Sequence, residues 1–299
     1  MFFEGSEKKV EIFLKPDTAA LRRHPDIDWN LVVAKANATV LSTLSNAHCD
    51  AYLLSESSLF VYDHRVIMIT CGTTSLVSAV EEMLRTFQSE DIAFITYERK
   101  NELAPEDQPS DFIEDADRLR QYVPGEYCRF GKENGHFVTV FYYGPDCQPV
   151  PGDMTLEILM HDIDESATRL FSQPDVPKSE LYGASGIDRI FEGFQVDDFI
   201  FDPMGYSLNA IRDKEYYTFH ITPQRECSYA SFETNHLFSG DMEAAFERVL
   251  SIFNPKTFTT VFFEHEGVGF PCPAGYRLNQ EKTNVICGFN VRFANYGKA

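Results

Sequence analysis

Basic side chains are scarce in this sequence. Lysine and arginine total 26 against 46 aspartates and glutamates, which gives a formal net charge of −20 at pH 7. Binding to nucleic acid or to an anionic membrane requires a basic surface that displaces counterions. The composition therefore argues against both partners. A small cationic ligand suits this charge better, although an acidic surface that only keeps the protein soluble would give the same total.

Long apolar runs and paired cysteines are also lacking. No uninterrupted apolar run approaches the roughly 18 residues that can cross a bilayer, and no basic segment followed by an apolar stretch opens the chain. The cysteines number seven and include no Cys-x-x-Cys pair, so they give neither zinc-ligand spacing nor an even disulfide framework. We therefore expect a soluble cytoplasmic protein with reduced thiols and no bound metal.

Alternating and helical patterns recur along the chain. Short β-branched and aromatic runs on either side of Asp63-His64 predict a hairpin that brings Ser57 and Cys71 together. Thr73-Thr74 is typical of a helix N-cap, and apolar residues follow at helical spacing as far as residue 87, before a strand pattern at 92–97. In the second half, the same reasoning predicts a helix ending near residue 253 and a strand at 258–263.

A faint internal echo suggests two similar halves. Val-Glu-Ile-Phe-Leu at 10–14 resembles Leu-Glu-Ile-Leu-Met at 156–160, and each is a strand pattern with one embedded acid. Chance alone often produces such a match, so the echo leaves duplication open. The proline-containing stretch 103–111 predicts a surface loop and not a domain boundary, so we expect one domain over residues 1–299. Many strands with interspersed helices favour an α+β fold of antiparallel sheets covered by helices.

Seven short motifs occur in the order found in a known family. They are Phe2-Phe3-Glu4-Gly5, the run from Leu54 to Ser58, Thr70-Cys71-Gly72-Thr73-Thr74, the run from Thr155 to Met160, Gly205-Tyr206-Ser207-Leu208-Asn209, His220-Ile221-Thr222-Pro223 and Ser231-Phe232-Glu233-Thr234-Asn235. Each alone would be a weak signal. Together they resemble the eukaryotic S-adenosylmethionine decarboxylase proenzymes.

The resemblance implies a fold and an activity. The fold is a four-layer α/β/β/α sandwich of two antiparallel sheets flanked by helices and built from two similar halves. The activity begins with self-cleavage between Glu56 and Ser57 into residues 1–56 and 57–299, which leaves a pyruvoyl group derived from Ser57 as the cofactor, without pyridoxal phosphate or metal. The processed enzyme would decarboxylate S-adenosylmethionine to the aminopropyl donor for spermidine and spermine synthesis.

Self-cleavage requires the Ser57 hydroxyl to attack the carbonyl carbon of Glu56. Replacing an amide by an ester is uphill, so the site needs backbone strain or donors for the oxyanion, and a base for the elimination that follows. The resemblance assigns His220 and Ser207 as helpers in this step. An imidazole that titrates near neutral pH would suit such a role.

Decarboxylation requires a proton donor at the α-carbon of the substrate. The resemblance nominates Cys71, and an ordinary thiol with a pKa of about 8.5 holds a transferable proton at neutral pH. Without the motif, a buried structural cysteine would be the usual interpretation. Glu4 and Glu7 match catalytic acids that lie near the reacting centre in the family.

The matched substrate residues describe a pocket for a sulfonium nucleoside. Phe3 and Phe201 correspond to two rings that stack on adenine, and aromatic faces also attract a sulfonium cation. Leu54 and Glu56 would present backbone groups to the adenine edge. Gln224 departs from the family, which often has a glutamate there to hold the ribose hydroxyls. An amide can still bond a hydroxyl but without the charge, so affinity falls by about 1 kcal/mol.

Several acids match the residues with which putrescine-activated relatives bind the diamine. The matched positions are Glu11, Asp153, Thr155, Glu157 and Glu233. In sheets covered on both faces these carboxylates would be buried and would need cations, whereas on edge strands they would face water. Ile69 and Glu98 replace a lysine and a serine of the mammalian pattern. Putrescine is therefore expected as an activator, with this reservation in the sequence.

Two other functions are compatible with parts of the sequence. A catalytically dead paralogue that acts as a regulatory subunit would normally lose Ser57 or its helpers, and this chain keeps them. A pyruvoyl decarboxylase of another amino acid would be compatible with Gln224, but not with the retained aromatic pair; Glu226 is close enough to replace the missing carboxylate. We expect either a homodimer of processed chains or a heterodimer with a paralogue.

Overall fold

The computed structural model divides the chain into two compact units. The structure describes residues 3–132, 135–145, 147–149, 152–224, 227–236, 242–265, 267 and 272–299. The N-terminal unit comprises Ser6–Gln148 and Ile286–Gly288, and the C-terminal unit comprises Met1–Gly5, Pro149–Val285 and Phe289–Ala299. Each unit is described by itself below.

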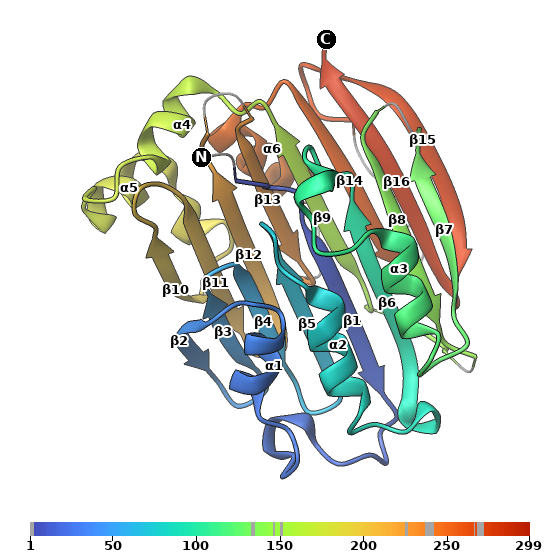
Figure 1. The fold of residues 1–299 in the computed structure, drawn as a ribbon. Helices are drawn as coiled ribbons and strands as arrows, with labels where there is room; N and C mark the ends of the chain where they lie inside the picture. Colours follow the sequence, from blue (N-terminus) through green and yellow to red (C-terminus); the bar gives the residue numbers. More distant parts are fainter. Residues whose placement is uncertain are drawn as a thin grey trace. The chain divides into compact units, whose positions relative to one another are not determined.

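The N-terminal unit is one antiparallel sheet with helices packed on one face (Figure 1). Its strands are β1 (Lys8–Leu14), β2 (Val40–Ser45), β3 (Asp50–Leu54), β4 (Ser57–Val61), β5 (Arg65–Thr70), β6 (Ile92–Lys100), β7 (Glu126–Gly131) and β8 (Phe137–Tyr143), in the order β2-β3-β4-β5-β1-β6-β8-β7. Its helices are α1 (Trp29–Lys35), α2 (Leu76–Leu84) and α3 (Phe112–Leu119). Alternate residues of β1, such as Val10 and Ile12, share a buried core with the apolar face of α2.

The C-terminal unit repeats this plan. Its strands are β9 (Thr155–His161), β10 (Gln195–Ile200), β11 (Tyr206–Arg212), β12 (Glu215–Thr222), β13 (Tyr229–Thr234), β14 (Thr257–Glu264), β15 (Tyr276–Ile286) and β16 (Phe289–Lys298), in the order β10-β11-β12-β13-β9-β14-β16-β15. Its helices are α4 (Glu165–Phe171), α5 (Lys178–Ser185) and α6 (Met242–Phe253), which share the core of the unit with one face of the sheet.

The two sheet orders confirm the predicted duplication. In each half the first strand in sequence occupies the fifth position in the sheet, between the fifth and sixth strands of that half. The two echoing segments are these strands, β1 and β9. The α+β class of two antiparallel sheets flanked by helices is confirmed, because each unit supplies one helix layer and one sheet of the predicted sandwich.

The predicted local elements are present with one shifted boundary. β4 and β5 form the expected hairpin, with Ser57 opposite Thr70. Helix α2 begins one residue later than predicted, because Ser75 is its N-cap and the Thr74 hydroxyl donates to the carbonyl of Cys71 at 2.8 Å. The predicted strand at 92–97 continues to residue 100 as β6, and the loop at 103–111 contains only a short 3₁₀ turn, Pro105–Asp107.

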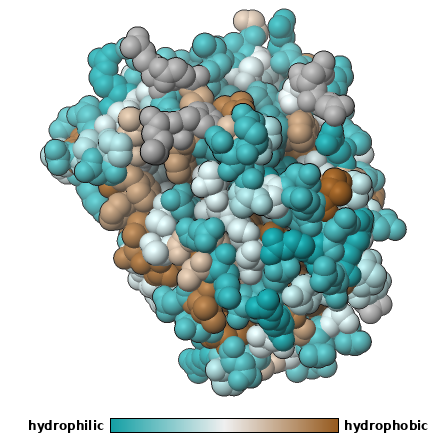
Figure 2. Space-filling view, viewed as in Figure 1, coloured by the Kyte–Doolittle hydropathy of each residue, from teal (hydrophilic) through white to brown (hydrophobic). Residues whose placement is uncertain are grey.

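The surface in view is mainly hydrophilic. Figure 2 shows apolar side chains in small groups among polar ones on this face, as expected for a chain rich in acids. Within the described residues, no helix is long and apolar enough to cross a membrane.

Candidate active site

The predicted cleavage bond lies at a tight hairpin. Ser55 and Glu56 form the two-residue turn between β3 and β4, and Leu54 pairs directly with Ser57. The turn is fastened to Thr39, whose carbonyl accepts the Ser55 N–H at 2.9 Å and whose N–H donates to the Ser55 hydroxyl at 3.0 Å. The Glu56–Ser57 peptide is therefore held by hydrogen bonds on its N-terminal side and by the sheet on its C-terminal side.

Ser57 has a strained backbone. Its φ is 118°, a value that residues with a Cβ rarely adopt. Such a conformation costs about 1–3 kcal/mol of conformational free energy. The residue is almost completely buried, and its hydroxyl donates to the Cys71 sulfur at 3.3 Å. This strain lies beside the predicted cleavage bond, where the attack of a serine on its own peptide would require it.

The main chain of Cys71 also contacts the bond to be cleaved. Its N–H donates to the Glu56 carbonyl oxygen at 3.2 Å. In the predicted cleavage that oxygen would gain negative charge when the Ser57 hydroxyl attacks the carbonyl carbon, and a donor already in place would stabilise the charge without reorganisation. Cys71 thus contacts both reacting groups, through its N–H and through its sulfur.

Burial keeps the Cys71 thiol protonated. Desolvation, with a smaller contribution from the Glu56 and Glu7 carboxylates, raises the pKa of the thiol well above its ordinary value. Burial likewise raises the pKa of Glu56 to about 7, and the positive charge of Lys8 opposes that rise. A thiol that stays neutral at physiological pH is a proton donor and not a nucleophile.

Ser207 and His220 form a buried pair in the C-terminal unit. They lie directly opposite each other on β11 and β12, and the Ser207 hydroxyl is 3.1 Å from His220 Nδ1. His220 Nε2 is 3.1 Å from the hydroxyl of Thr218, which itself donates to the carbonyl of Leu208 at 2.9 Å. This network assigns the proton to Nε2 and leaves the Nδ1 lone pair facing the Ser207 hydroxyl.

The expected neutral titration of His220 is wrong for the folded chain. Burial lowers its pKa to about 3, because an imidazolium ion would lose its hydration there. His220 is therefore a neutral imidazole at physiological pH. It can accept a proton from Ser207, but it holds that proton only while the developing negative charge of a reaction stabilises the imidazolium.

Backbone hydrogen bonds hold the two predicted adenine-binding residues, Phe3 and Phe201, in the C-terminal unit. The Phe3 N–H donates to Gln224 Oε1 at 3.0 Å, so the residue that departs from the family pattern holds the segment with the first aromatic ring. The Phe201 N–H donates to Gly205 O at 2.9 Å, and Gly205 has a φ of 124° that a glycine adopts without strain. Glu226 lies outside the described residues.

Three of the acids matched to the diamine site, Glu11, Glu157 and Glu233, are on interior strands. Glu157 of β9 lies directly opposite Glu233 of β13, and both are buried, as is Thr155. Tyr216 donates its hydroxyl proton to Glu233. The alternative that these acids lie on edge strands is wrong, because β1, β9 and β13 all have a neighbour on each side.

Two cations of the N-terminal unit contact Glu11. Arg65 Nε donates to its carboxylate at 2.6 Å, and the Lys9 ammonium lies 4.0 Å from it. The charge of this buried carboxylate is thus neutralised inside the N-terminal unit. Asp153 is half-buried just before β9.

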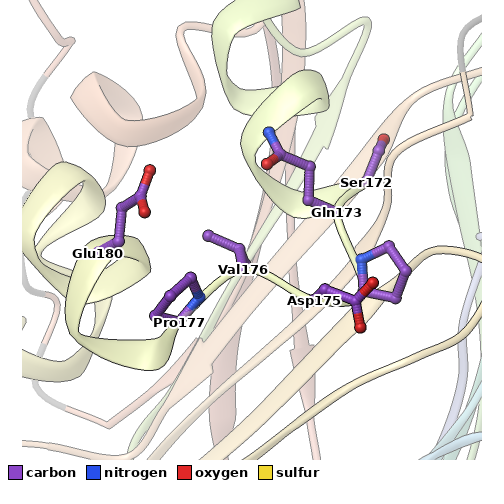
Figure 3. Close-up of a pocket in the computed structure, with 7 residues that line it drawn as sticks. Ser172, Gln173, Asp175, Val176, Pro177 and Glu180 are labelled. Atoms are coloured by element: carbon purple, nitrogen blue, oxygen red, sulfur yellow. The ribbon is translucent and has the colours of Figure 1, made fainter.

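A groove elsewhere in the C-terminal unit contains none of the predicted site residues. It has a volume of about 350 Å³ and is lined by the α4–α5 connection from Ser172 to Pro177 and by Glu180 (Figure 3). Its two carboxylates come from Asp175 and Glu180. Among the described residues, no group of three or more histidine, cysteine or acidic side chains is arranged to hold a metal ion.

Comparison with known proteins identifies the family. The family model for adenosylmethionine decarboxylase matches residues 1–290. The chain belongs to this family. S-adenosylmethionine decarboxylase proenzymes are 33% identical in Dictyostelium discoideum (92% of this chain, 77% of the relative), 32% in Drosophila melanogaster (99% and 95%) and 35% in Caenorhabditis elegans (87% and 76%). The solved Trypanosoma brucei AdoMetDC-delta26 monomer is similar, with a TM-score of 0.64 and 25% identity over 81% of this chain and 99% of that one.

The predicted site residues of this adenosylmethionine decarboxylase family member fall into two groups. The N-terminal unit carries Leu54, Glu56, Ser57, Cys71, Glu7 and Glu11, and the C-terminal unit carries Phe3, Glu4, Phe201, Ser207, His220, Gln224, Asp153, Thr155, Glu157 and Glu233. Sequence reasoning missed Lys8, a fully buried lysine beside the Cys71 turn. Lys8 stands at the start of an apolar strand, and a lysine there ordinarily indicates an exposed strand end, so nothing in the sequence was a reason to select it.

Proposed function

We propose that this chain cleaves itself between Glu56 and Ser57 and then decarboxylates S-adenosylmethionine with a pyruvoyl group derived from Ser57. The observation that carries the proposal is the geometry at the hairpin. A strained Ser57 donates its hydroxyl to Cys71, while the carbonyl to be attacked accepts the Cys71 N–H. Family membership supports the same activity.

The self-cleavage step balances without an external oxidant. Ser57 Oγ bonds to the Glu56 carbonyl carbon, the C–N bond breaks, and the amide becomes an ester with a free amine on Ser57. A base removes the α-proton of Ser57, and the ester oxygen leaves as the Glu56 carboxylate. The resulting dehydroalanine takes up water and loses ammonia. We propose that Ser207 and His220 supply the hydroxyl and the base, since Nδ1 of a neutral imidazole faces that hydroxyl.

The residues around Ser57 fit the group that this reaction would produce. A pyruvoyl group supplies a carbonyl that accepts the electrons left on the substrate when carbon dioxide departs. Cys71 would then give its proton to the α-carbon, and its buried neutral thiol suits that task. We propose Phe3 and Phe201 as the adenine-binding rings and Gln224 as the residue that orients the Phe3 segment.

Two buried acids of the C-terminal unit suit a diamine ligand. Glu157 and Glu233 are like charges on one face of adjacent strands, where a dication would reduce their repulsion. We propose them, with Thr155 and Asp153, as the diamine site, and assign Glu11 a smaller part because Arg65 already pairs with it. We also propose that the reaction takes place in the cytoplasm and supplies the aminopropyl donor for polyamines. The homodimer and the heterodimer with a paralogue stay predictions.

The test is release of labelled carbon dioxide from carboxyl-labelled S-adenosylmethionine. We expect turnover by the wild type and a loss of about 100-fold or more for Cys71→Ala that has cleaved itself, because the loss of a positioned acid costs that much. Labelled methionine, which lacks the nucleoside, should not react. Release from methionine but not from S-adenosylmethionine would indicate another amino-acid substrate, and release from neither would indicate a dead paralogue.

A further inference from the structure

Lys8 is a buried ammonium whose hydrogen bonds go mainly to one turn. It lies at the start of β1, is 1% exposed, and belongs to the face of the sheet that packs against the helices. Its Nζ donates to the carbonyl oxygens of Gly72 at 3.3 Å and Thr74 at 3.1 Å. The third bond goes to Gln108 Oε1 at 2.6 Å, so all three donors of the ammonium are used.

The turn held by Lys8 is the one that presents Cys71 to the cleavage bond. Residues 71–74 follow β5 and lead to Ser75, the N-cap of α2, and Gly72 takes a left-handed conformation with a φ of 63°. At one end of the turn the Cys71 N–H binds the Glu56 carbonyl oxygen. At the other end the Gly72 and Thr74 carbonyls are fixed by Lys8. Loss of the ammonium would leave two buried carbonyl groups without their donor, and the turn would shift to find others.

The charge of Lys8 acts on the same groups. It opposes the rise that burial causes in the pKa of both the Cys71 thiol and the Glu56 carboxyl. Burial lowers the pKa of Lys8 itself to about 8, and Arg99 adds to this effect. The carboxylates of Glu102 and Asp115 oppose it, and both accept hydrogen bonds from Arg99, at 2.6 Å and 2.8 Å.

We propose that Lys8 is a positioning residue for self-cleavage: its ammonium fixes the 71–74 turn so that the Cys71 N–H and sulfur stay on the Glu56 carbonyl and the Ser57 hydroxyl. This inference rests on the proposed function, since it concerns the same reaction. It assigns to Lys8 an action through Cys71 and no contact with the substrate.

The first experiment follows self-cleavage of freshly translated full-length chain in a cell-free system, by a time course of intact mass. Lys8→Met, which keeps the length and apolar stem of the side chain, should slow cleavage by about tenfold or more, since small displacements of reacting groups have effects of this size. The matched control is Lys100→Met. Lys100 is also a buried lysine of this sheet, on its opposite face, where its ammonium lies 3.8 Å from Glu98.

The second experiment moves the charge state of Lys8 without removing it. Because the folded pKa of Lys8 is about 8, wild-type cleavage should slow as the pH rises above 8 and the ammonium becomes neutral. Lys8→Met should lack that decline. Gln108→Glu replaces an amide nitrogen that has no hydrogen-bond partner among the described residues by an oxygen, and gives the ammonium an anionic partner. It should move the decline to higher pH.

The titration of Glu56, near pH 7, provides a second and lower transition in the wild type. In Lys8→Met this lower transition should move upward, because the opposing positive charge is gone. Melting temperatures of the uncleaved chains show that each variant is folded.

The outcomes separate the inference from the proposed function. If the wild type never cleaves, the proposed function fails. If the wild type cleaves and Lys8→Met matches it in rate and pH profile, the positioning role fails while the function stands. Equal slowing of cleavage by Lys8→Met and Lys100→Met would also contradict the inference. So would a cleavage rate that declines at the same alkaline pH in the wild type, Lys8→Met and Gln108→Glu.

Discussion

Cys71 and His220 carry the two proton transfers of the proposed chemistry, and burial moves the pKa of each away from its ordinary value. The Cys71 thiol becomes a weaker acid and stays protonated, whereas the His220 imidazole becomes a weaker base and stays neutral. Both groups thus begin the reaction uncharged. The residue types could be predicted from the sequence motifs, but these shifts depend on what surrounds each side chain in the fold.

The pKa of His220 predicts how stability depends on pH. The unfolded chain, with a pKa near 6.5, binds a proton that the folded chain refuses down to about pH 3, so the folded state loses stability as the pH falls through this window. In a Ser57→Ala background, the parent should lose about 2 kcal/mol more than His220→Gln between pH 7.5 and 5. Urea unfolding at both pH values measures this. An equal loss in the two proteins would show that His220 does not resist protonation.

The β3–β4 hairpin and the 71–74 turn are the elements that make the cleavage site. The hairpin gives Ser57 its strained φ, and the turn provides the donor to the Glu56 carbonyl. The short β-branched and aromatic runs on either side of Asp63-His64 predicted that β4 and β5 pair, and this pairing brings Ser57 to Cys71. The strain itself left no trace in the sequence, because serine is common in turns of every kind.

Two substitutions test the strain at the hairpin. Ser57→Gly and Ser57→Ala both remove the attacking hydroxyl, so both chains should stay intact and can be compared directly. Glycine adopts a φ of 118° without the cost that a Cβ imposes, and Ser57→Gly should therefore be the more stable by about 1 kcal/mol. The free energy of unfolding in urea provides the comparison. A more stable Ser57→Ala would mean that the hairpin stores no strain at this residue.

Strand β1 shows where sequence patterns stop being informative. Its alternation of apolar residues predicted a strand, but Lys8, Lys9 and Glu11 in the same segment are ordinarily signs of exposure. Their partners are distant in sequence: Gly72 for Lys8 and Arg65 for Glu11. Buried charged residues can be interpreted only when these tertiary partners are known.

At the scale of the whole molecule, the two sheets have the same strand order but differ in the residues at equivalent positions. β1 and β9 hold equivalent positions, and each keeps one buried acid, Glu11 or Glu157. In the N-terminal unit an arginine neutralises the acid. In the C-terminal unit Glu157 lies opposite Glu233 on the neighbouring strand. The family resemblance predicted two similar halves and the echo only suggested them, whereas the pairing of each acid could not be predicted.

The pairing of Glu157 with Glu233 predicts a response to putrescine. Diamine that binds the folded chain should raise the melting temperature and saturate, with about 2.7 kcal/mol of stabilisation at a hundredfold excess over its Kd. Glu157→Gln should weaken the response, and Glu247→Gln, which changes an exposed acid of α6, should not. Sodium chloride of equal ionic strength is the salt control. The same flat titration for the wild type and Glu157→Gln would remove the diamine site from this account.

Intact mass of the purified wild type and of Ser57→Ala tests the central claim most directly. The wild type should give two chains, residues 1–56 and residues 57–299, whose masses add to the precursor plus one water minus one ammonia. The larger chain should begin with a pyruvoyl group and have no N-terminal amine. Ser57→Ala should remain one chain of unchanged length. A single uncut wild-type mass, or the same two fragments from Ser57→Ala, would contradict self-cleavage by Ser57.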